Sequence, residues 1–194
     1  MFHKSNWDSS HLAFEYIRLF EKKIDKMVLA SLEGPDETIK YPKDTEEFLL
    51  RIAELSKYNY GSTIKYPDLE NKIKAVHNKL KNNPVTVALK DRQGRVDSIG
   101  ISNFELQLAI ATFYLKNPED SKSIPSLYSN MYKGDFTEIG GRVAILKKYV
   151  LNRIYPMPFA MDMRSGISGK RHWEVNKQIE TSVLGSSTNF LFYE

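Results

Sequence analysis

The feature that most constrains the fold of this chain is a helical pattern that leads directly into a short apolar run. Residues 8–10 (Asp-Ser-Ser) are helix-capping types, and the apolar residues after them recur at four-residue spacing, which predicts a helix over about 10–23. Residues 27–32 are apolar without alternation, as expected of a strand buried on both faces of a parallel sheet. An acidic loop containing Gly34-Pro35 ends this strand. The order indicates an α/β fold.

The rest of the sequence predicts a mostly helical body with one β-hairpin. Thr45 is expected to cap a helix, and Pro67 to begin a second helix with apolar residues on one face. The runs 85–89 and 96–101 predict hairpin strands, because Gly94 between them suits a turn position with positive φ. Further helices are expected around 104–115, 125–131, 139–150 and 175–183, whereas the Pro-rich stretch 155–162 is unsuited to a helix interior.

Composition excludes several classes of function. The 194 residues carry a net charge of +4 with mixed signs along the predicted helices, which is typical of solvated faces, so no nucleic-acid partner is expected. The absence of cysteine excludes disulfides and cysteine metal sites. No apolar run approaches the roughly 20 residues that span a bilayer, so no membrane span is expected.

The four histidines are not expected to be catalysts or metal ligands. His3 lies near the chain end, His11 in the first turn of the first helix, His77 on a helix face predicted to be exposed, and His172 beside Arg171. None is paired with a carboxylate at metal-ligand spacing. The sequence therefore predicts no metal and no cofactor.

Several short strings, in order, carry a resemblance to a known family. They are Ser10-His11-Leu12-Ala13, residues 28–36 (VLASLEGPD), residues 84–87 (PVTV), Leu127-Tyr128 with residues 134–136 (GDF), residues 160–162 (AMD) with Ser165-Gly166, and Leu184-Gly185 with Asn189-Phe190. Their order and spacing resemble the central part of α/β-hydrolases of the prolyl-aminopeptidase and tripeptidyl-peptidase type.

The resemblance implies a fold class and a domain plan. The chain is expected to be an α/β-hydrolase fragment: a mostly helical cap domain with one β-hairpin, plus a strand and a helix of the parallel sheet. Residues 1–36 would be a piece of the hydrolase core, 37–185 the cap, and 186–194 the start of the return to the core. The implied activity is that of serine aminopeptidases, which hydrolyse peptide bonds near a peptide N-terminus through an acyl-enzyme.

The nucleophile position departs from the family pattern. When the pattern G-x-S-x-G is aligned through Ser10-His11, its glycines fall at Ser5 and Ser9 and its nucleophile at Trp7. Tryptophan cannot attack a carbonyl, and Ser9 and Ser10 are better explained as helix caps. The family's acid and histidine follow the cap, beyond Glu194. No catalytic residue is assigned, and the chain is expected to be truncated and inactive alone.

Three acidic residues are the predicted substrate-binding site. Glu33, Asp36 and Asp162 resemble carboxylates near the cap of such aminopeptidases that bind the substrate's free amine, which implies a peptide with a free N-terminus as partner. The alternative is that Glu33 and Asp36 shape a loop and Asp162 caps a turn.

Two other classes of protein stay open. One is a non-catalytic peptide- or partner-binding module derived from the cap, able to self-associate through an exposed sheet edge at 27–32. The other is an unrelated, complete α+β domain. The compartment is not assigned: a complete chain would be cytoplasmic, whereas a chain that lacks an N-terminal part could be exported.

Overall fold

The computed structural model describes residues 8–20, 25–28, 34, 36–58, 65–90, 93–151, 160 and 166–190. This part of the chain is mostly helical and contains one two-stranded antiparallel sheet. The chain divides into two compact units. The first comprises Met1–Lys40 and Ile154–Asn176, and the second Tyr41–Arg153 and Lys177–Glu194. The hydrolase domain boundaries at 36/37 and 185/186 stay predictions.

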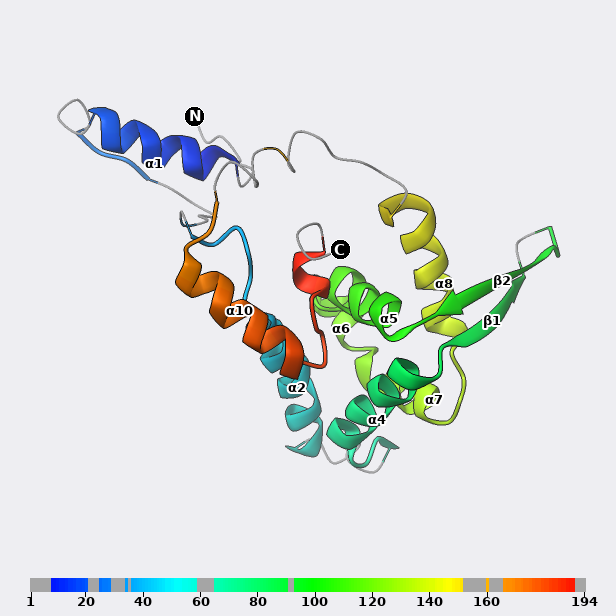
Figure 1. Cartoon of the computed structure of the whole chain (residues 1–194). Helices are drawn as coiled ribbons and strands as arrows, with labels where there is room; N and C mark the ends of the chain where they lie inside the picture. The colour runs from blue at the N-terminus through cyan, green and yellow to red at the C-terminus, as the bar shows by residue number, and fades with distance from the viewer. Residues whose placement is uncertain are drawn as a thin grey trace. The chain divides into compact units, whose positions relative to one another are not determined.

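In the first unit, helix α1 (Asp8–Phe20) confirms the predicted N-terminal helix, which is blue in Figure 1. It begins at Asp8, so Ser9 and Ser10 lie within its first turn and do not precede the helix as caps. Glu15 and Arg18 form an ion pair of 2.5 Å one turn apart. The elbow positions Ser5 and Trp7 lie outside the described residues.

The prediction of a strand over 27–32 is wrong for its first two residues. Residues 26–28 have no regular secondary structure. Met27 and Val28 are 40% and 91% exposed, respectively, although they were predicted to lie in a strand buried on both faces. A strand needs a neighbour to pair its backbone groups, and the described sheet consists of the hairpin strands alone. Residues 29–33 lie outside the described residues, and the part of the chain that the structure describes contains no parallel sheet.

The second unit begins with helices α2 (Pro42–Tyr58) and α4 (Leu69–Asn82). Helix α2 starts before Thr45, because the fixed φ of Pro42 suits the first helical position. Helix α4 starts two residues after Pro67, since Asp68 has a left-handed φ of 57° and cannot be part of the helix.

The predicted hairpin is confirmed. Strand β1 (Val85–Lys90) pairs antiparallel with β2 (Val96–Ile101), with Val85 opposite Ile101 and Lys90 opposite Val96. Gly94 in the connection has a φ of 80°, as its turn position requires. Helix α8 (Thr137–Leu146) packs against both strands (Figure 1).

The helices after the hairpin follow the predicted order, and the described part of the chain adds two π-helical turns, one short helix and one 3₁₀ turn. Helix α5 (Asn103–Ala109) continues into a π-helical turn, η2 (Ile110–Tyr114), and α8 continues into a second one, η3 (Lys147–Leu151). Helix α6 (Pro118–Ser121), which the sequence did not predict, precedes α7 (Ile124–Tyr132). Helix α10 (Gly169–Thr181) and a short 3₁₀ turn, η4 (Ser187–Asn189), complete the described elements.

One hydrophobic core lies in the second unit. It combines the apolar faces of its helices with the end of β2, and α4 packs along α7. The predicted apolar face of α4 is confirmed, since Leu69, Ile73, Val76 and Leu80 are buried. Of the helices described, none has the length and apolar character needed to cross a bilayer.

Candidate functional site

Of the three predicted site residues, the structure describes Asp36. Glu33 and Asp162 lie outside the described residues, as does nearly all of the Pro-rich stretch 155–162. Asp36 lies in a turn of the first unit, 132 residues away in sequence from its main partner, Ser168.

Asp36 supports the N-terminus of α10. Its Oδ1 accepts a hydrogen bond from the Ser168 backbone N–H at 2.6 Å, and its Oδ2 accepts one from the Ser168 hydroxyl at 2.6 Å. The Ser168 hydroxyl oxygen in turn accepts from the Arg171 backbone N–H at 3.2 Å, as a helix cap does. The Arg171 side chain donates through Nε to the Ile39 carbonyl at 2.8 Å. Together these contacts join the loop at 36–39 to the start of α10.

The electrostatics of Asp36 match this supporting role. The Ser168 hydroxyl, then its backbone N–H, and then the charge of Arg171 lower the pKa of Asp36, so the carboxylate is ionised near neutral pH. The nearby Arg171 cation opposes binding of a second cation such as a peptide ammonium. These contacts favour loop shaping for Asp36, and amine binding stays a prediction for all three acidic residues.

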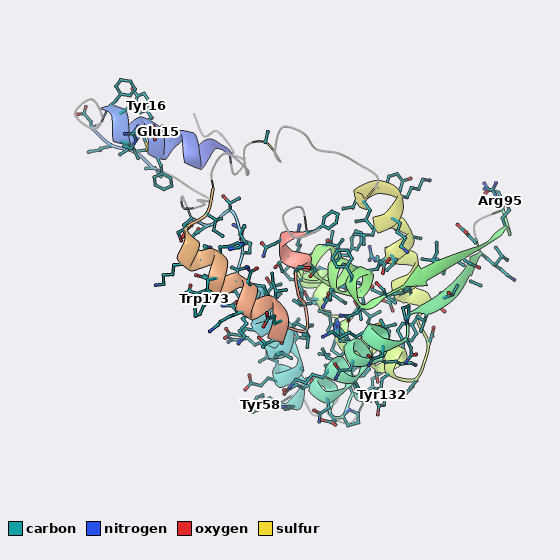
Figure 2. All side chains as sticks on the ribbon, in the orientation of Figure 1. Glu15, Tyr16, Tyr58, Arg95, Tyr132 and Trp173 are labelled. Atoms are coloured by element: carbon teal, nitrogen blue, oxygen red, sulfur yellow. The ribbon has the colours of Figure 1, made fainter. Side chains whose placement is uncertain are left out.

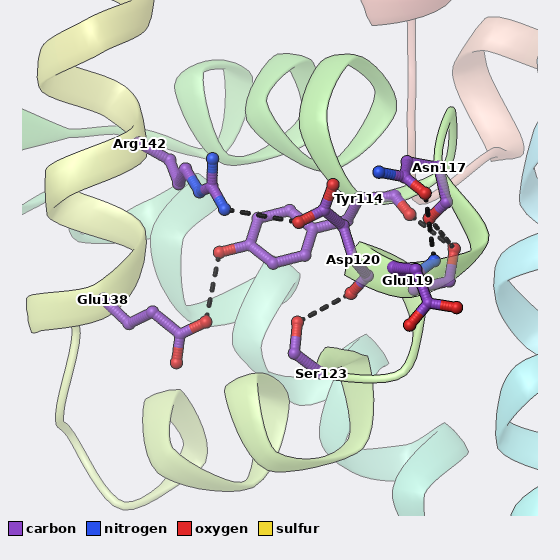
Figure 3. A network of polar contacts seen from close by, with 8 residues as sticks. Tyr114, Asn117, Glu119, Asp120, Ser123, Glu138 and Arg142 are labelled. Carbon is purple, nitrogen blue, oxygen red and sulfur yellow. Dashed lines mark hydrogen bonds and ion pairs between the residues drawn. The ribbon is translucent and has the colours of Figure 1, made fainter.

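A polar network around Tyr114 is a second candidate, which the sequence did not predict. Figure 3 shows the phenol directed at α8, between Glu138 and Arg142. Its hydroxyl donates to Glu138 Oε1 at 3.2 Å, while the guanidinium of Arg142 lies 5.6 Å from the ring centres of both Phe113 and Tyr114. Arg142 Nη2 is also 3.4 Å from Asp120 Oδ1 at the start of α6.

The π-helical turn η2 positions this network. A π turn adds a residue to the helical repeat and rotates the following side chains, and such turns are frequent at functional sites. Here the turn places Tyr114 in the core, 1% exposed, with its backbone carbonyl accepting from the Ser121 hydroxyl at 2.5 Å. The network thereby ties η2 to both α6 and α8.

The Tyr114 network combines a hydrogen-bond donor, a cation and two carboxylates. Burial first, and then the charge of Glu138, raise the pKa of Tyr114 to about 12, so the phenol stays protonated at neutral pH and acts as a donor. Arg142 is permanently charged and half-exposed. These groups can hold a polar ligand group in place.

His77 is buried, which corrects the prediction of an exposed helix face. Its side chain is 3% exposed and lies beside the apolar stripe of α4, next to Val76. Its Nδ1 is 2.8 Å from Asn103 Oδ1 and its Nε2 is 2.9 Å from the Tyr128 hydroxyl. Because Nε2 of this buried ring faces the Tyr128 phenol and not a serine hydroxyl, His77 is not arranged as the base of a serine triad.

A third polar cluster joins β2, α5 and η3. Ser102 and Glu105 form a capping box at the start of α5, and Lys147 Nζ lies 3.0 Å from Glu105 Oε1 and donates to the Gly100 carbonyl at 2.8 Å. Burial opposes ionisation of Glu105, but the bonds from Ser102 and Lys147 outweigh it and lower the pKa of Glu105. The cluster fixes the junction of three elements.

Within the described residues, no group of three or more His, Cys, Asp or Glu side chains is arranged to hold a metal ion. His172 lies exposed on α10, with its Nε2 3.3 Å from Asn176 Nδ2.

Comparison with known proteins gives no relative. No family model matches the chain. No curated protein and no solved structure matches it significantly.

Proposed function

We propose that this chain is a cap-derived protein of the serine-aminopeptidase line of α/β-hydrolases that binds a peptide and does not cleave it. The observation that carries the proposal is the helical body with a single hairpin at β1–β2. That body is what the resemblance to the family implies for a cap. The family strings at 84–87, 127–128 and 134–136 fall on β1, on α7 and on the turn before α8, which are parts of this body.

The hydrogen-bond partners of the described polar groups support a role in binding without cleavage. His77 uses both ring nitrogens for Asn103 and Tyr128, and the Tyr114 phenol remains protonated. Asp36 accepts two bonds from Ser168. In this proposal Glu33 and Asp162 are therefore better candidates than Asp36 for holding a substrate ammonium.

The proposal is tested by pairing binding with turnover on the full chain. We expect a short peptide with a free N-terminus to bind, and an amino-terminal fluorogenic peptide to be left intact. Ser9→Ala and Ser10→Ala are the controls, because they remove the two serines beside the aligned elbow. Turnover that disappears in either variant would contradict a purely binding role and show that the elbow is displaced.

A second candidate function, binding of a protein partner, is favoured by one face of α2. Phe48, Leu55 and Tyr58 lie on one side of this helix and are 42%, 57% and 80% exposed (Tyr58 is labelled in Figure 2). Adjacent exposed apolar side chains mark interaction surfaces more often than isolated ones do. Light scattering of the purified chain and of Leu55→Ser tests this candidate for a partner that is a second copy of the chain, and the expected result is a self-association that the substitution weakens.

A further inference from the structure

The buried cluster of His77, Asn103 and Tyr128 connects three helices. His77 lies on α4, Asn103 begins α5 and Tyr128 lies on α7. Tyr128 is fully buried, and its ring centre is 5.8 Å from that of His77. The two hydrogen bonds, of 2.8 and 2.9 Å, span 26 and 51 residues of sequence, so they hold distant parts of the second unit together.

The partners of His77 define its protonation state. The amide oxygen of Asn103 can only accept, so Nδ1 of the imidazole carries the proton and donates it. Nε2 is then the acceptor, and the Tyr128 hydroxyl donates to it. The imidazole is neutral, and all the hydrogen-bonding capacity of its ring is used.

Among the described residues, no negatively charged group that could stabilise a protonated imidazole faces His77. From α7 the facing titratable group is the Tyr128 phenol, behind which lies Tyr114 of η2, itself bonded to Glu138. From α5 the facing group is the Asn103 amide, and α2 packs against α4 and contributes buried apolar residues to the core. Burial therefore dominates and lowers the pKa of His77 to about 4, against a small opposing effect of Asn103.

Protonation is incompatible with the closed cluster for a second reason. A charged imidazole donates from both nitrogens, so Tyr128 would have to turn from donor to acceptor. Its own hydroxyl proton would then lose its acceptor inside the core, where an unmade hydrogen bond is costly. Opening of the helices relieves both the buried charge and the lost bond.

We propose that the His77–Asn103–Tyr128 cluster is an acid-sensitive latch, which holds α4, α5 and α7 together at neutral pH and releases them when acid charges the imidazole. The unfolded chain binds a proton at the ordinary pKa of 6.5, whereas the folded chain binds it at about 4. Stability from this residue is therefore complete above the unfolded value and falls as the pH drops toward the folded value.

The test is the pH dependence of urea unfolding of the full chain and of His77→Gln. Glutamine keeps an amide donor and acceptor but does not titrate. Between about pH 7 and about pH 5, the ratio of unfolded to folded wild-type protein should rise roughly twentyfold more than that of His77→Gln. The carboxylates of the chain titrate in both proteins, so they change both stability curves equally. If the stabilities of the two proteins fall in parallel as the pH drops, His77 contributes nothing to the acid sensitivity and the latch is overturned.

A spectroscopic readout keeps the proposal testable if His77→Gln does not fold. The imidazole carbon and nitrogen resonances of His77 in the wild-type chain report its charge directly. We expect them to remain those of a neutral ring, protonated at Nδ1, throughout the folded range down to about pH 5. A ring that becomes charged near its ordinary pKa while the chain stays folded would overturn the proposal.

Discussion

Asp36 shows how a carboxylate of the type that binds a ligand can instead support the backbone. Both of its oxygens accept hydrogen bonds from Ser168, directly before α10. Carboxylates stabilise helix N-termini because they accept hydrogen bonds from the free N–H groups there and interact favourably with the positive end of the helix dipole. The position of Asp36 in the structure is therefore explained without a ligand.

The first prediction at the residue scale concerns Asp36→Ala. Removing the carboxylate leaves Ser168 without its two acceptors, so the first turn of α10 should open more often. Hydrogen exchange should show faster exchange of the Ser168 and Arg171 amides. Asp25→Ala, at an exposed position of the same unit, is the control and should leave both amides unchanged. Unchanged protection in Asp36→Ala would argue against the supporting role.

The second residue-scale prediction concerns Tyr114→Phe. The substitution removes the hydroxyl that donates to Glu138 but keeps the ring beneath Arg142. We expect a loss of about 1 kcal/mol in the free energy of unfolding, typical of one buried hydrogen bond. Tyr132→Phe is the control, because Tyr132 is 55% exposed and should change stability little. Equal effects of the two substitutions in urea unfolding would contradict the network.

At the scale of elements, the contact between α8 and the hairpin depends on a glycine. A Cβ on Gly140 would lie 3.3 Å from Val87 Cγ1 of β1, whereas a Cβ on Gly141 would meet no atom within 4 Å. Both residues lie within α8, so alanine brings the same gain in helix propensity at either position.

Gly140→Ala and Gly141→Ala therefore form a matched pair. We expect Gly141→Ala to stabilise the chain by up to about 1 kcal/mol, the difference in propensity between glycine and alanine. Gly140→Ala should be less stable than Gly141→Ala, since crowding at Val87 offsets the same gain. Thermal unfolding of the two variants measures the difference, and a Gly140→Ala variant as stable as Gly141→Ala would show that α8 does not pack closely on β1.

Elements with local signals were predictable from the sequence. The hairpin was predictable because two strand-forming runs flank a turn that contains Gly94, and α4 because its apolar residues recur at helical spacing. The π turn at Ile110–Tyr114 was not predictable, because it interrupts the 3.6-residue repeat by which a helix is identified in a sequence.

Features that depend on distant partners were not predictable. His77 was assigned to an exposed face because Asn103 and Tyr128, which allow its burial, lie 26 and 51 residues away. The network around Tyr114 was missed for the same reason, although the four-residue spacing of Glu138 and Arg142 does place them on one face of a helix. Asp36 was chosen by residue type alone, and its partner lies 132 residues away.

At the scale of the whole molecule, the second unit is a mostly helical body with one hairpin and one hydrophobic core. Its polar clusters around Tyr114, His77 and Glu105 each join separate elements. Within each cluster the polar groups form hydrogen bonds or ion pairs with one another. This arrangement suits a body that presents a surface and keeps its shape. The proposed role is accordingly recognition of a peptide end, with no bond broken by the described residues.

The most direct test of this role is a calorimetric titration of the full chain with one short apolar peptide in two forms, one with a free N-terminus and one N-acetylated. An ammonium held by carboxylates in a partly dry site typically contributes a severalfold or larger difference in affinity. The account predicts that the free-amine peptide binds at least about tenfold more tightly and is recovered uncleaved. Equal affinity for the two forms, or recovery of cleaved peptide, would contradict it.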